Sequence, residues 1–311
     1  MTPGNGLKKK LITILGPTAT GKTQLAANLA ARLGGEVISA DSRQIYRKMD
    51  IGTGKDLDDY IVNGIKVPYH LIDIVDPGYE FNVFEYQHQF YEVYNDIVDR
   101  HKQPILCGGS GLYIQAVLEG YKLLHVPPDY ELRQDLEEQT DRELELILSE
   151  LTKLHNVSDT SSRKRMIRAI EIAMYYKGNE TREMNLYPPI DSKIFGVYFD
   201  RESVRQRITE RLRFRFNNGM IKEVESILNS GISADKLKYY GLEYKFITMF
   251  TLGELSYKDM FEKLNIAIHQ FAKRQMTWFR KMEKDGFKIK WIDGSLTLDK
   301  KIEIILNDIE T

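Results

Sequence analysis

The sequence predicts an α/β fold built on a parallel sheet, because short buried runs alternate with helix-like stretches. The apolar, β-branched runs are Leu11–Leu15, Glu36–Ala40 and Pro104–Cys107. Between them lie Gln24–Leu33 and Phe84–Arg100, which have helical patterning. Strands that alternate with helices in this way form a parallel sheet covered on both faces.

A change of composition after residue 120 predicts a helical insertion. Asp129–Leu154 carries leucine and isoleucine at roughly helical spacing, and Ser161–Tyr176 repeats that pattern. Ile194–Phe199 is typical of a further strand, and a tail from Asp293 can add a last helix. We therefore expect a core of residues 1–120 and 191–311, interrupted by a helical insertion domain of residues 121–190.

Composition limits the function classes. The 311 residues include 44 Lys+Arg and 45 Asp+Glu, a formal net charge of -1. Such a balance argues against non-specific coating of nucleic acid, which needs many cation–phosphate contacts, but leaves room for a local basic patch. The single cysteine, Cys107, cannot form an internal disulfide, and no Cys/His cluster has zinc spacing.

Targeting signals are also weak. The apolar stretch after Lys8 stops at Gly16, too early for a signal peptide, and no apolar run approaches the ~20 residues of a membrane span. We expect a cytoplasmic monomer that does not bind a membrane.

A glycine-rich loop predicts a phosphate site. Gly16-Pro17-Thr18-Ala19-Thr20-Gly21-Lys22-Thr23 fits the pattern G-x-x-x-x-G-K-[ST] between a predicted strand and a predicted helix. Its glycines let backbone N–H groups surround a phosphate, Lys22 supplies a charge, and the Thr23 hydroxyl is suited to Mg²⁺. A chance match is disfavoured, because the loop has both a predicted strand before it and a predicted helix after it. The loop indicates a phosphate ligand without fixing the reaction.

Two further segments follow predicted strands. Asp41-Ser42-Arg43-Gln44 follows Glu36–Ala40, so Asp41 is expected at the same sheet edge as the glycine-rich loop. There it can ligate Mg²⁺ or act as a general base, and capping of the following turn explains it equally well. Gly108-Gly109-Ser110-Gly111 has more glycines than a turn needs, which favours close approach to a ligand.

Arginines cluster on one predicted helix in the second half. Six arginines and two glutamates lie between residues 201 and 215, with Arg207, Arg211 and Arg215 at four-residue spacing. The row can cap a diphosphate or follow a nucleic-acid backbone, and a solvated charged face is the ordinary alternative. Basic groups around Arg165 and near Trp278 suit RNA phosphates and splayed bases.

An ordered set of motifs resembles the tRNA dimethylallyltransferases, also called tRNA isopentenyl transferases, over almost the whole chain. The set comprises Gly16 to Thr23, Asp41-Ser42-Arg43-Gln44-Ile45-Tyr46, Tyr69-His70-Leu71-Ile72-Asp73, Pro104 to Tyr113, Arg168-Ala169-Ile170-Glu171, Gly219-Met220-Ile221-Lys222-Glu223-Val224 and Ala272-Lys273-Arg274-Gln275-Met276-Thr277-Trp278. The loop alone is common, whereas the ordered set is specific.

The resemblance implies a P-loop NTPase-like core with a helical insertion that grips the anticodon stem-loop of tRNA. It implies transfer of a dimethylallyl group from dimethylallyl diphosphate to N6 of adenosine 37, 3′ to the anticodon, with release of diphosphate. Asp41 accepts the amine proton, while Lys22, Arg211 and Mg²⁺ stabilise the departing diphosphate. The loop from Gly16 to Thr23 binds the diphosphate, and Thr23 and Asp41 are candidate Mg²⁺ ligands.

The resemblance also implies a set of tRNA contacts. They are Asp41, Ser42, Arg43, Gln44, Ser110, Arg133, Lys164, Arg165, Met166, Ile167, Arg168, Tyr240, Gly241, Leu242, Glu243, Tyr244 and Lys245. The target base must leave its stack to reach them.

Three segments depart from the family pattern. Ser110 stands where threonine is usual and keeps the hydroxyl. Gly52-Thr53-Gly54-Lys55-Asp56 stands where Gly-Thr-Ala-Lys-Pro is typical, which allows that loop to sit differently. Glu243, in Leu242-Glu243-Tyr244-Lys245, replaces an expected glycine and adds a charge beside an implied tRNA contact.

Three other functions fit parts of the sequence. A small-molecule P-loop kinase can use the same loop, but needs a nucleoside triphosphate. A prenyltransferase acting on free adenine nucleotide needs no basic helical insertion. A P-loop protein that only senses nucleotide leaves Asp41 without a task.

Overall fold

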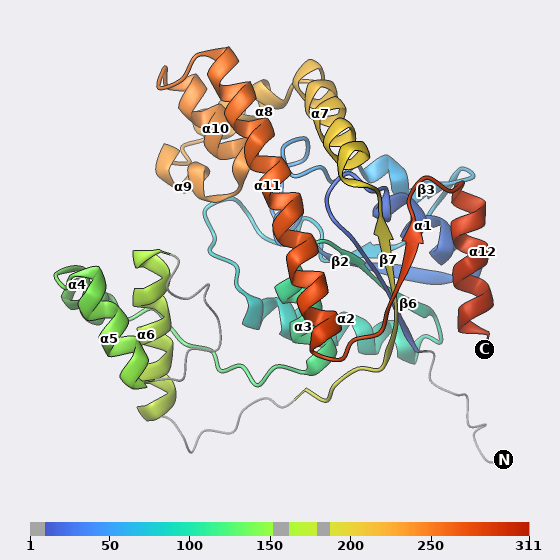
Figure 1. The fold of residues 1–311 in the computed structure, drawn as a ribbon, viewed down its shortest axis with the longest axis horizontal. Helices are drawn as coiled ribbons and strands as arrows, with labels where there is room; N and C mark the ends of the chain where they lie inside the picture. Colours follow the sequence, from blue (N-terminus) through green and yellow to red (C-terminus); the bar gives the residue numbers. More distant parts are fainter. Residues whose placement is uncertain (1–9, 152–161, 179–186, 311) are drawn as a thin grey trace. The chain divides into compact units, whose positions relative to one another are not determined.

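The computed structural model describes residues 10–151, 162–178 and 187–310, drawn in colour in Figure 1. The chain divides into two compact units: Met1–Gly120 with Pro188–Thr311, and Tyr121–Tyr187. Lys8, residues 152–154 and Ser161, which belong to predicted segments, lie outside the described residues. Within the described residues, no helix combines the length and the apolar character needed to cross a bilayer.

The larger unit is built on a six-stranded parallel sheet with the order β5-β2-β6-β1-β7-β8. Its strands are β1 (Leu11–Leu15), β2 (Gly35–Ala40), β5 (Tyr69–His70), β6 (Gln103–Gly108), β7 (Ser192–Tyr198) and β8 (Ile289–Asp293). The predicted strands are confirmed, and β5 and β8 extend the sheet at its edges. Leu15 and Ala40 both pair with Gly108, so the carboxyl ends of β1, β6 and β2 lie level and adjacent.

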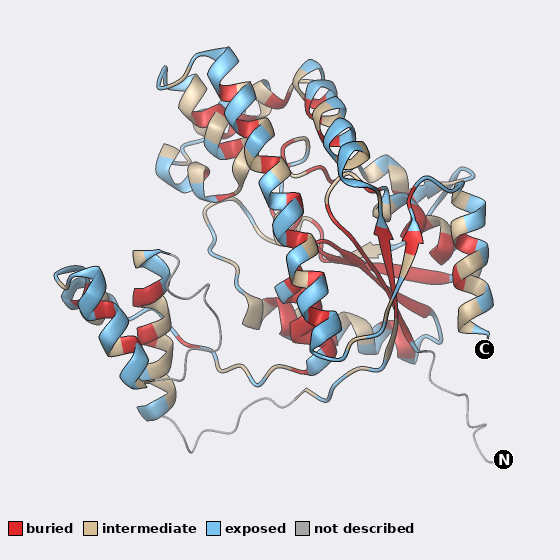
Figure 2. Ribbon diagram, viewed as in Figure 1, coloured by how far each residue is buried: buried red, intermediate tan, exposed pale blue. Residues whose placement is uncertain are grey.

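Helices cover the sheet because each presents an apolar face to it. They are α1 (Lys22–Leu33), α2 (Val83–Asp99), α3 (Gly111–Glu119) and α12 (Leu298–Ile309). Side chains of α1 and α12 share one buried cluster with alternate strand residues such as Ile14 and Phe195. Helices α2 and α3 pack together on β6, and Figure 1 shows them on the other side of the sheet from α1 and α12. The strands are buried along most of their length (Figure 2).

A second buried cluster encloses the chain that follows β2. The helices that form it are α7 (Arg201–Asn217), α8 (Met220–Asn229), α9 (Ala234–Tyr239), α10 (Leu242–Thr251) and α11 (Tyr257–Lys284). Ile45, Tyr46 and Met49 contribute to this cluster, so the loop after Asp41 lies between the sheet and these helices. A 3₁₀ turn, η1 (Leu57–Tyr60), and a hairpin of β3 (Ile61–Val62) and β4 (Ile65–Lys66) precede β5.

The smaller unit contains α4 (Tyr130–Glu137), α5 (Asp141–Leu151) and α6 (Arg163–Gly178) around their own apolar core. The helical pattern predicted over Asp129–Leu154 is broken into two helices. The break has a local cause: the Thr140 hydroxyl accepts a hydrogen bond from the backbone N–H of Glu143, whose carboxylate accepts the N–H of Thr140. This reciprocal pairing starts a new helix.

Candidate active site

The loop between β1 and α1 has the backbone shape of a phosphate cradle. Gly16 has φ 154° and Gly21 has φ 76°, which side chains with a Cβ rarely adopt. A Cβ on Gly16 would lie 2.5 Å from the carbonyl oxygen of Val197. Gly21 is the N-cap of α1 and provides no side-chain cap hydrogen bond, which leaves the first N–H groups of α1 for an anion.

A cavity of about 420 Å³ lies against this cradle. Its walls come from the cradle, from the segment before β3 and from α7: Ala19, Thr20, Gly21, Lys22, Thr23, Asp56, Asp59, Arg207, Glu210, Arg211 and Phe214. A larger groove of about 800 Å³ runs beside α7 and His269 and contains none of the cradle residues. The smaller cavity is therefore the one in which Lys22 can meet a phosphate ligand.

Lys22 lies partly buried within its own loop. Its Nζ donates a hydrogen bond to the carbonyl oxygen of Pro17 at 2.6 Å. Burial lowers the pKa of Lys22 to about 8; Arg211 adds to this effect, while Cys107 and Asp41 oppose it. Arg211 and Asp41, the other two predicted catalytic side chains, therefore lie within electrostatic reach of Lys22.

Two arginines of α7, Arg207 and Arg211, face the cradle. Arg207 Nε donates to the carbonyl oxygen of Ala19 at 2.8 Å, and Arg211 Nη1 lies 3.3 Å from Thr18 Oγ1. Arg211 Nη2 also lies 2.6 Å from Asp56 Oδ2. Arg215 is buried. Arg207 and Arg211 therefore form part of the cavity wall, although Arg207 also remains exposed to solvent, and Arg215 is buried behind them.

Asp41 follows β2 at the same edge of the sheet as the cradle. Because β6 alone separates β2 from β1, and neighbouring strands lie about 4.8 Å apart, Asp41 begins roughly 10 Å from the cradle. Its Oδ1 accepts the backbone N–H of Arg43 at 2.9 Å. Ser110, at the N-cap of α3, accepts the N–H of Ser42 at 3.0 Å and donates its own N–H to the carbonyl oxygen of Ala40 at 3.1 Å. Ser110 thus fixes the start of the Asp41 loop.

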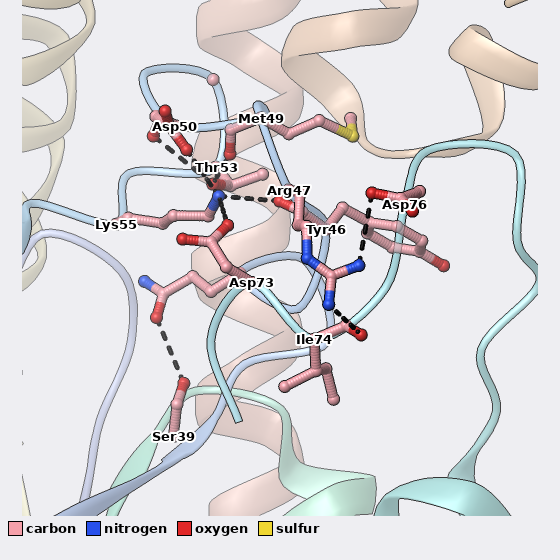
Figure 3. Close-up of polar contacts among 12 residues, drawn as sticks. Ser39, Tyr46, Arg47, Met49, Asp50, Thr53, Lys55, Asp73, Ile74 and Asp76 are labelled. Carbon is pink, nitrogen blue, oxygen red and sulfur yellow. Dashed lines mark hydrogen bonds and ion pairs between the residues drawn. The ribbon is translucent and has the colours of Figure 1, made fainter. Parts of the chain in front are cut away.

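A buried lysine holds the far end of the Asp41 loop (Figure 3). Lys55 is 1% exposed, and its Nζ contacts the carbonyl oxygen of Tyr46 at 2.7 Å, Asp50 Oδ1 at 2.5 Å and Asp73 Oδ1. The amide of Gln44, which is also buried, donates to the carbonyl oxygen of Gly54 at 3.0 Å. The segment from residue 44 to residue 55 is therefore tied to itself and to Asp73.

Sequence reasoning did not assign Gln275 or Glu223, although both lie in the quoted motifs. Gln275 Oε1 accepts the N–H of Thr18 at 2.9 Å and its Nε2 donates to the carbonyl oxygen of Gly109 at 2.9 Å, so α11 joins two loops of the site. Glu223 accepts the backbone N–H groups of Asp50, Ile51 and Gly52 at 2.7–2.9 Å. Only their place in an ordered motif could have signalled them.

The glycines at the end of β6 and just after it are required by packing. A Cβ would lie 2.1 Å from the carbonyl oxygen of Ala40 at Gly108, and 2.3 Å from Gln275 Nε2 at Gly109. At Gly111 it would meet the ring of Trp278 at 2.3 Å. The close approach that these glycines permit is to protein atoms, whereas the sequence had favoured a ligand.

The predicted tRNA contacts at residues 240–245 divide into buried and exposed positions. Tyr240 and Tyr244 are buried, and the Tyr244 hydroxyl donates to Glu223 Oε1 at 2.6 Å. Lys245 is exposed, whereas Gly241, Leu242 and Glu243 are partly buried. Burial raises the pKa of Glu243, and the nearby Arg215 guanidinium opposes that shift. Glu243 therefore belongs to the same charged neighbourhood as the α7 arginines.

The remaining predicted contacts lie in the smaller unit. Arg133 and Arg168 both bind Glu171, which is 2% exposed; Arg133 does so through two hydrogen bonds of 2.9 Å. Burial pushes the pKa of Glu171 up, but the hydrogen bonds from the two arginines outweigh it and hold the pKa below its usual value. Met166 and Ile167 are buried in this unit's core, whereas Lys164 and Arg165 have exposed side chains on α6.

Comparison with known proteins decides the family. The model of a family described as IPP transferase matches residues 44–282. A curated relative from Parabacteroides distasonis, named tRNA dimethylallyltransferase 1, is 59% identical over 94% of this chain and 95% of its own length. The chain belongs to the IPP transferase family.

Solved structures agree with this membership. The tRNA isopentenylpyrophosphate transferase of Bacillus halodurans is 33% identical, with a TM-score of 0.71 over 97% of this chain and 96% of its own. A eukaryotic dimethylallyltransferase acting on tRNA, 21% identical, shares the fold with a TM-score of 0.77 over 97% of this chain and 80% of its own. The P-loop NTPase-like α/β core is thus the fold of this IPP transferase.

The geometry explains two departures of this IPP transferase from the family pattern. Asp56 has φ 42° and ψ 53°, a left-handed conformation that proline, fixed near φ −65°, cannot adopt. Gly54 has φ 66°, and a Cβ there would lie 1.7 Å from Arg215 Nη2. The loop from residue 52 to residue 56 therefore has a conformation that the typical alanine and proline do not fit.

Thr23 and Asp41 were the predicted Mg²⁺ ligands. Within the described ranges, no group of three or more His, Cys, Asp or Glu side chains is placed to hold a metal ion. Mg²⁺ keeps several waters and commonly binds through few protein ligands together with substrate phosphates. The Thr23 hydroxyl on the cavity wall, with the oxygens of a diphosphate, fits that mode of binding.

Proposed function

We propose that this IPP transferase transfers a dimethylallyl group from dimethylallyl diphosphate to N6 of adenosine 37 in tRNA and releases diphosphate. One observation carries the proposal: the cradle with Lys22 and Arg211 stands at the same sheet edge as Asp41, in a chain 59% identical to a tRNA dimethylallyltransferase. The cradle suits the leaving diphosphate, and Asp41 suits the attacking amine.

The reaction needs one bond to form and one to break. The adenine N6 attacks the allylic carbon, and the bond from that carbon to the diphosphate oxygen breaks. The amine proton passes to the Asp41 carboxylate, while Lys22 and Arg211 hold the negative charge that develops on the diphosphate. Thr23, with Asp41 as the second candidate ligand, would hold Mg²⁺, which would supply positive charge to balance the diphosphate.

Recognition of tRNA is assigned to three groups of residues. The segment from Asp41 to Gln44 and Ser110 meet the target base, and the segment from Tyr240 to Lys245 lies beside it. Arg133 and Lys164 to Arg168, on the insertion, bind the anticodon stem-loop. Among them, Lys164, Arg165 and Lys245 have exposed side chains suited to RNA phosphates. We further propose that the protein acts as a monomer in the cytoplasm.

The decisive experiment uses purified protein, dimethylallyl diphosphate, Mg²⁺ and tRNA that carries adenosine 3′ of its anticodon. Mass spectrometry of the tRNA nucleosides should show isopentenyladenosine, and ATP in place of the prenyl donor should give no modified product. Prenylation of free adenine nucleotide but not of tRNA, or transfer of labelled phosphate from ATP to a small acceptor, would refute the proposal.

A further inference from the structure

Asp56 places a carboxylate inside the cavity proposed for diphosphate. Its Oδ2 lies 2.6 Å from Arg211 Nη2 and 3.7 Å from Arg215 Nη2. Arg211 is also the guanidinium that reaches the cradle, through Thr18 Oγ1 at 3.3 Å. A carboxylate oxygen therefore occupies one donor of the arginine that is expected to meet the leaving diphosphate.

The local backbone is shaped to keep this arrangement. Asp56 takes a left-handed conformation, which aspartate tolerates better than most residues. The absence of a side chain at Gly54 lets both guanidiniums approach, since a Cβ there would lie 1.7 Å from Arg215 Nη2 and 2.5 Å from Arg211 Nη2. Both features serve to bring one carboxylate and two arginines together.

Arg215 gives Asp56 a second partner. Its side chain is 11% exposed, and among the described residues its buried Nη2 finds no hydrogen-bond acceptor. If Arg211 turns toward a ligand, the Asp56 carboxylate can move the short distance to Arg215 and remain paired. Asp56, whose side chain is 49% exposed, would then keep a cationic partner when Arg211 exchanges between two anions.

We infer that Asp56 is an internal anion that pairs with Arg211, competes with diphosphate for it and so weakens retention of the product. The inference rests on the proposed function, because it takes the cradle to be the diphosphate site. Carboxylate and diphosphate oxygens offer an arginine the same charge-assisted hydrogen bonds, so one displaces the other.

The test measures the binding of inorganic diphosphate with Mg²⁺ by calorimetry. Asp56→Asn keeps the shape and tolerates the same left-handed backbone, but it removes the charge. A partly exposed ion pair is worth at most ~1 kcal/mol, so freeing Arg211 should lower the Kd by up to about fivefold. Asp58→Asn, an exposed aspartate two residues away, is the matched control and should leave the Kd unchanged.

A second background separates competition for Arg211 from general repulsion. In Arg211→Gln protein, Asp56→Asn should change the Kd by less than twofold, because the residue over which the anions compete is gone. An equal gain in both backgrounds would overturn the inference, as would weaker or unchanged binding by Asp56→Asn. Wild-type protein that binds no diphosphate would instead overturn the proposed site itself, so the two failures are distinguishable.

Discussion

Replacing Lys55 with methionine should destabilise the larger unit and loosen the loop that carries Asp41. The Lys55 ammonium is buried with all three of its donors in use, on the carbonyl oxygen of Tyr46, on Asp50 and on Asp73 (Figure 3). Removing one partner of a buried ion pair costs ~3–5 kcal/mol when the other charge stays buried. The side chains of Asp50 and Asp73 are 57% and 35% exposed, so water can solvate them afterwards. We therefore expect the lower end, ~3 kcal/mol.

The assay is urea unfolding followed by far-UV circular dichroism, with Lys102→Met as the matched control. Lys102 is exposed, so its variant should stay within ~0.5 kcal/mol of wild type. In conditions where Lys55→Met is folded, its rate of tRNA modification should also fall, because Lys55 fixes the far end of the Asp41 loop. A loss of stability no larger than that of the control would refute the claim that these ion pairs hold the loop.

Three further outcomes follow from the geometry. Asp41→Asn keeps an acceptor for the N–H of Arg43 but cannot take a proton. The prenylation rate should therefore fall by ~10²–10⁴-fold, while the melting temperature stays unchanged. A rate within threefold of wild type would show that Asp41 only caps its turn. Hydrogen bonds from Arg100 hold the pKa of Glu36 at about 2 although burial opposes them, so its stabilisation is complete above pH 4.5 and is lost as the pH falls toward 2. After a discount for the half-exposed Arg100, Glu36→Gln should cost ~2 kcal/mol at pH 7 in urea titrations and much less near pH 2. An equal cost at both pH values would contradict the pKa shift. Gln275→Ala releases the N–H of Thr18 in the cradle, so it should raise the KM for dimethylallyl diphosphate more than the KM for tRNA in steady-state assays. Equal changes in both KM values would argue against a role of Gln275 in fixing the cradle.

The centre of the sheet could be predicted from the sequence, and its edges could not. Leu11–Leu15 and the runs that became β2 and β6 are buried on both faces, so most of their residues are apolar. At one edge, β5 has two residues, too few for any pattern. At the other, β8 alternates exposed Lys290 with buried or half-buried neighbours, a weaker signal over five residues. Pairing with β7 rather than its own composition makes it a strand.

The predicted site divides in the same way. The cradle and Asp41 were identifiable because each follows a predicted strand, and parallel strands bring their carboxyl ends to one edge. The partner of Arg211 was not identifiable, since Asp56 lies 155 positions away in the chain and nothing local marks the pair. The roles assigned to Lys164 through Arg168 came from resemblance and stay predictions. Local sequence can identify the side chains of a site, but contacts between residues far apart in the chain decide which of them are already paired.

Asp56 lies beside the proposed diphosphate site, and Glu243 lies beside an expected tRNA contact. Each of them puts negative charge where a polyanion is proposed to bind. The structure joins them through the arginines of α7. Burial and the neighbouring Arg211 lower the pKa of Arg215 to about 10, while Asp56 and Glu243 act to raise it, so the acids stabilise a buried cation. In the cavity wall itself, the three cations Lys22, Arg207 and Arg211 match the three acids Asp56, Asp59 and Glu210. A carboxylate inside this cavity can therefore regulate how firmly Arg211 holds a product without making the cavity repel it outright.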